Sequence, residues 1–138
     1  MGNGNLQEVE ADSACFVCGQ QSKIGLKAGF ATDKETATSK ATLKLSAEYQ
    51  GWHDVIHGGI VAALLDEACV YACLAKAEQA VTAELQIRYR KPVPVGAEVT
   101  VSGALLDCSR KVWQAQSRLL IDDTLYAEAT AKVFILKQ

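Results

Sequence analysis

Alternating apolar and polar residues dominate this 138-residue chain, and a period of two is typical of half-buried β-strands. In residues 36–45 the odd positions carry alanine, serine or leucine, whereas the even positions carry threonine or lysine. The same pattern, with turn residues between its segments, predicts about six strands. The expected strands are residues 25–31, 36–45, 81–91, 98–107, 111–122 and 124–137.

The segment 81–92 alternates over its whole length. One face carries Ala83, Leu85, Ile87 and Tyr89, and the other carries Thr82, Glu84, Gln86, Arg88 and Arg90. Because proline cannot donate a hydrogen bond to a neighbouring strand, Pro92 is expected to end this strand. The pattern therefore predicts one regular strand in which Thr82 and Leu85 point to opposite faces.

A different pattern occupies residues 58–77, where alanine and leucine predominate and apolar residues fall on nearly every face of a helix. Such a helix must be surrounded by other elements. One continuous antiparallel sheet has enough area to curl around it, whereas a flat sheet would leave its back face wet. The predicted fold class is α+β, with a curved antiparallel sheet of about six strands wrapped around one long central helix, which is the hotdog fold.

The composition fits one compact domain. A content of 49% hydrophobic and 22% charged residues is typical of a soluble globular protein, so we expect a single domain at residues 15–138 after a flexible arm at residues 1–14. The net charge of −2 gives no basic surface for nucleic acid. No segment predicts a secretory signal or a membrane span, so a cytoplasmic protein without nucleic-acid or membrane partners is expected.

Five cysteines, an odd number, agree with reduced thiols. Cys69 and Cys73 lie four residues apart in the predicted helix and are expected to pack as small hydrophobic side chains. Cys15 and Cys18 have the spacing of a metal-ligand pair or a redox pair. Zinc normally takes four ligands, however, and no second pair is present. The sequence therefore predicts a knuckle-like turn at residues 15–18, with no metal and no cofactor.

Asp66 and Glu67 interrupt the most hydrophobic segment of the chain. A carboxylate in apolar surroundings without a partner is costly or has its pKa raised, so each needs a specific reason. Adjacent residues point about 100° apart on a helix, so only one of the two can face a given cleft. Asp66 is the candidate catalytic acid, with Glu67 as a rival. The alternative is a structural pair, in which Glu67 meets a basic strand residue and Asp66 caps or bridges a neighbouring element.

Gly58 and Gly59 lie where the helix should begin. Their backbone N–H groups are expected to be free and at the positive end of the helix dipole, which makes an oxyanion-type donor site. Eight residues of helix separate Gly58 from Asp66 by about 12 Å, so the two residues of one chain cannot both contact one substrate carbonyl group. The spacing predicts a twofold dimer with antiparallel helices, in which Gly58 of one subunit faces Asp66 of the other.

These residues carry a resemblance to a known family. The motifs HGGIVAALLDEA, YQG, VTAELQIRYRKPV and CFVCG resemble those of the bacterial hotdog-fold acyl-CoA thioesterases of the phenylacetate-pathway (PaaI-like) and 4-hydroxybenzoyl-CoA type. The likeness covers residues from about 15 to 135. His-Gly-Gly followed by an acid nine residues after the histidine is fairly specific to that family. The expected partners are acyl-CoA and further copies of the chain, with a dimer as the minimal active unit and a dimer of dimers as the assembly.

The resemblance also implies residue roles. Gly58 would donate its N–H to the thioester carbonyl, Asp66 would be the nucleophile or general base, and His57 would help to orient the thioester or the loop. Thr82 matches a hydroxyl position that in some members holds the attacking water or the carboxylate.

Gly51 departs from the family pattern. Several relatives carry a polar amide six residues before the histidine, where this chain has Gly51. Gly51 has no side chain that could position the attacking water, and His53 is the candidate replacement.

Coenzyme A carries phosphates, so a local basic cluster is expected at the mouth of the site. Solvated charges on an exposed strand face are the alternative explanation for any one of these residues. The helix residues Leu65, Cys69 and Tyr71 would line an acyl pocket or belong to the core. The candidate substrate-binding residues are Arg88, Arg90, Lys91, Arg110, Lys111 and, at the rim, Trp52.

Thioester hydrolysis is the leading functional hypothesis, and two others stay open. A hotdog dehydratase would use a histidine and an acid as proton shuttles, and His57 with Asp66 could imitate that pair across a dimer. A non-catalytic acyl-CoA-binding module is the third. The identity of the acyl group is open in all three.

Overall fold

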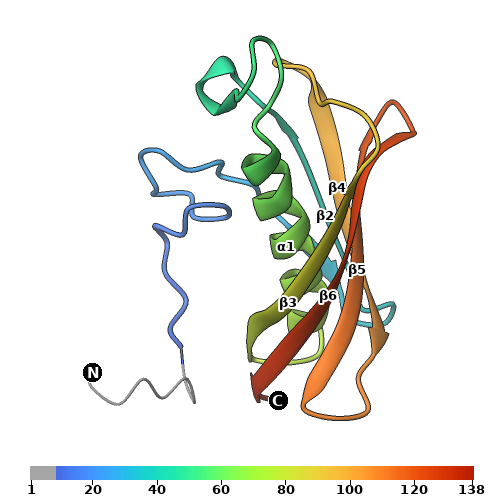
Figure 1. The fold of residues 1–138 in the computed structure, drawn as a ribbon. Coiled ribbons are helices and arrows are strands. Elements are labelled where there is room, and N and C mark those ends of the chain that lie inside the picture. Colours follow the sequence, from blue (N-terminus) through green and yellow to red (C-terminus); the bar gives the residue numbers. More distant parts are fainter. Residues whose placement is uncertain (1–8) are drawn as a thin grey trace.

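The structure is a computed structural model, and it describes residues 9–138. One antiparallel sheet of six strands curves around an α-helix (Figure 1). The elements are β1 (Ala31–Asp33), β2 (Thr38–Lys44), the 3-10 turn η1 (Ala47–Tyr49), α1 (Gly58–Leu74), β3 (Gln79–Tyr89), β4 (Glu98–Asp107), β5 (Val112–Ile121) and β6 (Thr124–Lys137). The order across the sheet is β1-β2-β4-β5-β6-β3, so β1 and β3 are its edges. The predicted arrangement of sheet and helix is confirmed.

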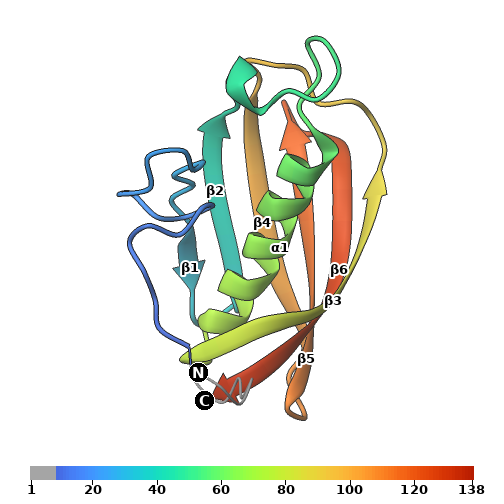
Figure 2. The ribbon, with the colours of Figure 1, turned by 60° about the vertical axis from the view of Figure 1, so that its left-hand side comes forward.

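The core lies between α1 and the concave face of the sheet (Figure 2). The buried residues of α1 recur at intervals of three and four, which is the spacing of one helix face. They are Val61, Leu64, Leu65, Ala68, Cys69, Ala72 and Cys73. The segment before β1 covers the other side of the helix, where the ring of Phe30 stacks on that of Tyr71 at 5.1 Å (Figure 1). This second cover explains why apolar residues occur on several faces of α1.

Small residues of the sheet allow α1 to approach closely. A Cβ atom at Gly103 would lie 2.1 Å from the carbonyl oxygen of Ala68, so only glycine fits at this position of β4. The hydroxyl of Ser39 donates to the same oxygen at 2.6 Å, and the hydroxyl of Ser117 donates to the carbonyl of Leu65 at 2.8 Å. These buried hydroxyls are thereby satisfied. They also fix the turn of α1 that carries the two adjacent carboxylates.

A β-bulge interrupts β3 where regular alternation is predicted. Thr82 pairs with Val133 and Leu85 with Ala131, whereas Ala83 has no partner in the register of β6. Val133 and Ala131 both face the core, so Thr82 and Leu85 lie on the same, helix-facing side. The prediction that they point to opposite faces is wrong, because one extra residue in a strand reverses the side-chain direction beyond it.

The first predicted strand is also misplaced. Leu26 and Ala28 are buried, as their alternation indicates, but their N–H groups donate to the carbonyl oxygens of Phe16 and Val17. Residues 25–30 are therefore paired with the preceding loop, and β1 begins only where the predicted strand ends. Alternation identifies the buried side chains of an extended segment, but it does not identify the backbone that the segment pairs with.

The predicted limits of the helix and of the domain can be compared with the structure. α1 ends at Leu74, three residues before the predicted end. Residues 1–8 of the predicted flexible arm lie outside the described residues, and within its remainder Ser13 donates a hydrogen bond to Gln21 at 3.0 Å. Within residues 9–138, no helix is both long enough and apolar enough for a transmembrane span.

Candidate active site

A groove of about 1040 Å³ lies at the N-terminal end of α1. The loop before the helix, the first turn of the helix and the end of β3 form its walls. Trp52 is 85% exposed, so its ring is available to a ligand at the mouth of the groove. The groove brings together six of the predicted site residues, which are Trp52, His57, Gly58, Gly59, Arg90 and Lys91.

His57 caps the helix at the base of this groove. Its Nδ1 atom accepts a hydrogen bond from the N–H of Gly59 at 2.8 Å, so the expectation that both glycine N–H groups are free is wrong for Gly59. The N–H of Gly58 donates to no acceptor within residues 9–138 and lies at the positive end of the helix dipole. Because Nδ1 accepts, a neutral His57 carries its proton on Nε2, where it can donate to a ligand.

Tyr89 holds the first peptide of the helix and also lines the groove. Its hydroxyl donates to the carbonyl oxygen of Gly58 at 2.8 Å. Sequence reasoning misses Tyr89, because strand alternation assigns it only to the apolar face of β3. Its position at the end of that strand, immediately before the basic residues, is the signal that could have identified it.

Asp66 lies two turns further along α1 and does not line the groove of its own chain. Its Oδ1 atom accepts a hydrogen bond from the hydroxyl of Thr82. The bulge in β3 makes this contact possible, since it turns Thr82 towards the helix. Asp66 is half-buried and faces an edge strand of the sheet.

Glu67 points away from Asp66, towards the segment before β1. Its Oε2 atom accepts a hydrogen bond from the thiol of Cys15 at 3.6 Å. No lysine or arginine among residues 9–138 forms an ion pair with Glu67, so the structure does not support the alternative in which Glu67 meets a basic strand residue. The two adjacent carboxylates therefore face different neighbouring elements and have different environments.

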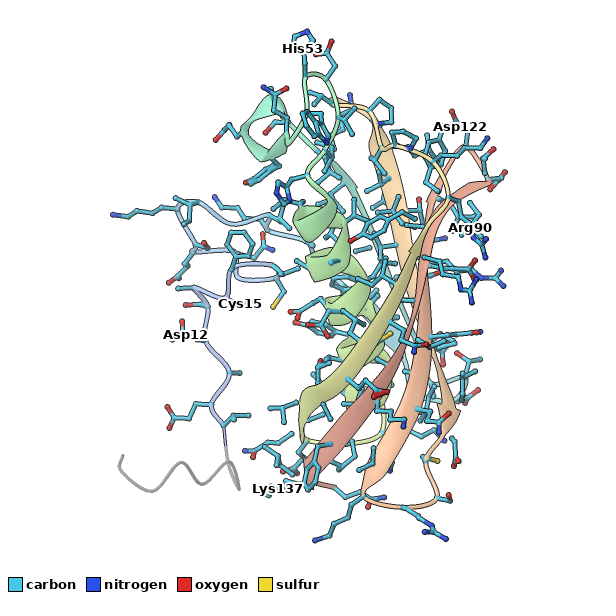
Figure 3. The ribbon with its side chains drawn as sticks, viewed as in Figure 1. Asp12, Cys15, His53, Arg90, Asp122 and Lys137 are labelled. Atoms are coloured by element: carbon cyan, nitrogen blue, oxygen red, sulfur yellow. The ribbon has the colours of Figure 1, made fainter. Side chains whose placement is uncertain are left out.

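The predicted basic cluster is only partly assembled at the groove. Arg90 donates through Nε and Nη2 to Glu128 at 2.9 and 2.7 Å, and Figure 3 shows its side chain on the outer side of the sheet. The ammonium of Lys91 lies 5.7 Å from the ring centre of Tyr126. Arg88 is paired in register with Glu128 on β6 and does not line the groove.

Arg110 and Lys111 are far from the groove within one chain. They belong to the hairpin between β4 and β5, at the end of the sheet opposite to the start of α1 (Figure 1). The expectation that they join the other basic residues at one mouth is therefore wrong for a single chain. The sequence shows one basic group after β3 and another between β4 and β5, but it does not show at which end of the sheet each group lies.

A second cavity of about 510 Å³ lies beside the groove and shares His57 and Gly59 with it. Gln50 lines this cavity, so a side-chain amide is present one residue from the position where the family pattern has one. A Cβ atom at Gly51 would lie 3.2 Å from the His57 ring, so glycine leaves room for that ring. His53 lines neither cavity, since its side chain is 90% exposed at the tip of the loop (Figure 3).

Two of the three proposed pocket residues of α1 belong to the packed interior, and the third, Tyr71, is half-buried. Leu65 and Cys69 are fully buried against the sheet, and Tyr71 is covered by Phe30. Burial raises the pKa of the Cys69 thiol from 9.0 to about 11, so this thiol stays protonated and unreactive near neutral pH. These residues support α1 and do not line the groove.

A family model and a curated relative both identify this chain as similar to thioesterases. The model of the Thioesterase superfamily matches residues 53–128, which is more than half of the chain. The chain is also 37% identical over 84 residues to acyl-coenzyme A thioesterase THEM4 of Mus musculus. That match includes 59% of this chain and 36% of THEM4, so the chain spans about a third of the length of this relative.

Solved structures share the fold. A phenylacetic acid degradation-related protein from Ralstonia eutropha JMP134 superposes with a TM-score of 0.74 at 22% identity, over 80% of this chain and 86% of that one. The protein smu.793 from Streptococcus mutans UA159, solved with bound acetyl CoA, gives a TM-score of 0.74 at 17% identity, over 86% and 98% of the two chains. At these identities the matches establish the arrangement of strands and helix.

Proposed function

Since the chain belongs to the thioesterase superfamily, whose model matches residues 53–128, we propose that it hydrolyses acyl-CoA thioesters to a free acid and coenzyme A. The observation that carries this proposal is the N–H of Gly58, which lies in the groove at the positive end of α1 and has no acceptor among residues 9–138. Hydrolysis develops negative charge on the carbonyl oxygen, and a fixed backbone donor stabilises that charge more than the ground state.

The carboxylate of the reaction is Asp66 of a second subunit. Within one chain, α1 is unbroken between Gly58 and Asp66, so the separation of about 12 Å along the helix axis persists. Asp66 is held by Thr82 on β3, which is an edge strand whose outer backbone groups can pair with another chain. A twofold dimer built along this edge, with antiparallel helices, brings Asp66 of each subunit towards Gly58 of the other.

The reaction breaks the thioester C–S bond and forms a C–O bond. Asp66 either takes a proton from the attacking water or attacks the acyl carbon itself, giving an anhydride that water then cleaves. The proton released from water passes to the departing thiolate of coenzyme A. Nε2 of His57, whose other ring nitrogen is fixed by the helix cap, donates to the thioester or to bound water.

Coenzyme A binds at the mouth of the groove. Lys91 offers a positive charge for its phosphates, and the exposed ring of Trp52 offers a flat apolar surface for the adenine. The charge of Arg90 is largely committed to Glu128. The acetyl CoA bound to the Streptococcus mutans protein supports a coenzyme A ligand for this fold.

Replacement of Asp66 by asparagine tests the proposal. Asp66→Asn keeps the shape of the side chain and removes its basicity, so kcat for thiol release from a panel of acyl-CoAs should fall by about 10²–10⁴-fold. Asp122→Asn, in the exposed turn between β5 and β6, is the matched control and should retain activity. Near-normal turnover by Asp66→Asn would contradict the assignment. Enoyl absorbance without thiol release would instead identify a dehydratase.

Isotope labelling tests for the covalent route to hydrolysis. A single turnover in water enriched in heavy oxygen leaves label in Asp66 if the carboxylate forms an anhydride that water opens at the aspartyl carbonyl. Label in the product acid alone is expected for direct attack by water, and also for an anhydride that water opens at the acyl carbonyl.

A further inference from the structure

Three potential metal ligands converge outside the groove. The sulfur atoms of Cys15 and Cys18 and a carboxylate oxygen of Glu67 lie within 4.8 Å of one another. The sulfur of Cys15 points towards α1 from the loop before β1 (Figure 3). The thiol of Cys15 donates to Glu67, and the N–H of Cys18 donates to the sulfur of Cys15 at 3.5 Å. Two thiols from a loop and one carboxylate from a helix therefore share one small volume.

The loop is built to hold both sulfur atoms in this position. The N–H of Gly19 donates to the carbonyl of Cys15 at 2.9 Å. A Cβ atom at Gly19 would lie 2.4 Å from the backbone nitrogen of Cys15, so only glycine permits this turn. The pairing of residues 16 and 17 with the segment 26–28 fixes the other side of the loop. The knuckle-like turn predicted from the sequence thus has a defined geometry, with its thiols facing α1.

The geometry points to a site for a thiophilic divalent cation, with zinc as the expected metal, bound by Cys15, Cys18 and Glu67. Thiolate sulfur selects zinc over magnesium or calcium, and zinc also accepts carboxylate oxygen. The fourth position is left to water, as in zinc sites with three protein ligands. The sequence alone lacks a third ligand, because Glu67 lies about fifty residues from the cysteines and only the fold brings it to them.

The charge balance of the cluster favours a cation. No basic side chain of residues 9–138 forms an ion pair with Glu67. A bound cation would neutralise the Glu67 carboxylate and stabilise both thiolates.

The cation would also organise one wall of the second cavity. Phe16, which lies between the two cysteines in sequence, lines that cavity together with Ile60 and His57. Fixing Cys15 and Cys18 to α1 therefore fixes the position of Phe16 near the candidate active site. Metal loss should raise the KM for acyl-CoA and leave kcat nearly unchanged, since no metal ligand lies in the groove.

Metal binding can be measured without any assay of activity. The full-length chain, purified with reducing agent and stripped by a chelator, is titrated with zinc chloride and then with cobalt chloride. We expect equimolar zinc by elemental analysis and a thiolate-to-cobalt charge-transfer band. Cys18→Ser should abolish the band, and Glu67→Gln should weaken cobalt binding by at least about tenfold. Cys108→Ser is the matched control, because Cys108 is an exposed thiol in the distant hairpin.

Several results would overturn the site. One is the absence of stoichiometric zinc and of a charge-transfer band in reduced protein whose circular dichroism is native. Another is equal cobalt affinity in Glu67→Gln and wild type, which would remove the carboxylate from the ligand set. A Cys15–Cys18 disulfide that re-forms in air, combined with failure of the reduced form to bind either metal, would assign the pair to redox chemistry. These outcomes do not depend on Asp66, so they are independent of the proposed thioesterase activity.

Discussion

At the scale of single residues, neighbouring side chains on α1 acquire different chemistry from their partners. Asp66 meets the hydroxyl of Thr82 on an edge strand, whereas Glu67 meets the thiol of Cys15 in a loop. The angle of about 100° between successive residues produces this division. A hydrophobic helix can therefore carry two adjacent carboxylates, provided that separate elements supply a polar partner for each.

The proposed donor role of Gly58 is testable with one substitution. Gly58 is the first residue of α1, where proline is tolerated, and the extended ψ of 134° at His57 suits a residue before proline. Gly58→Pro should preserve the helix, remove the N–H and lower kcat by about 10²–10³-fold. Gly58→Ala retains the N–H, and its Cβ would lie at an ordinary 3.5 Å from the Tyr89 hydroxyl.

Steady-state kinetics of both variants, with circular dichroism and Tm as controls for folding, provide the measurement. Equal losses of kcat in Gly58→Ala and Gly58→Pro would reject the N–H as the oxyanion donor, because only the proline variant lacks it.

Residue-level prediction from sequence succeeds where the local chain determines the outcome. The positions of Gly58 and His57 at the helix start follow from the His-Gly-Gly pattern before an apolar run. The contact between Thr82 and Asp66 depends on a bulge, and a bulge leaves no mark in strict alternation. The third partner of the two cysteines depends on tertiary contact. The sequence did not predict these two contacts, because one depends on strand register and the other on how a loop packs against α1.

At the scale of elements, α1 is positioned by the backbone of the sheet as well as by its side chains. Gly103 on β4 permits the close approach, and Ser39 and Ser117 bind helix carbonyl groups. Alternation and helical spacing predict that sheet and helix exist and which faces they bury. They do not predict this close approach, because a glycine within a strand could equally mark a bulge or a bend.

Substitution of Gly103 measures how much the close approach matters. Gly103→Ala places a Cβ atom 2.1 Å from the Ala68 oxygen, so α1 must move away from β4. The free energy of unfolding should fall by about 1–3 kcal/mol or more, as in other overpacked cores. Gly29→Ala is the matched control, since a Cβ atom there meets nothing within 4 Å. Urea unfolding of both variants makes the comparison, and a stability of Gly103→Ala equal to wild type would contradict it.

At the scale of the whole molecule, the proposed active site needs two chains, because its proposed donor and its proposed carboxylate lie far apart within one chain. The groove holds the exposed N–H of Gly58, whereas Asp66 lies two turns away beside the edge strand β3. The helix length between them is set by covalent geometry, so no rearrangement of side chains closes the gap. The number of residues between Gly58 and Asp66 already gives their separation, because both residues belong to one regular helix.

Mixed dimers test the two-subunit site directly. In a hybrid of Asp66→Asn and Gly58→Pro subunits, one site combines both substitutions and the other combines Gly58 of the first subunit with Asp66 of the second. Random pairing of equal amounts makes half of the dimers hybrid, each with one intact site of two. The mixture should therefore recover about a quarter of the wild-type kcat per chain, although each variant alone is nearly inactive. If Gly58 and Asp66 acted within one chain, neither subunit would hold an intact pair. Co-refolding the two variants would then recover nothing above the separate variants.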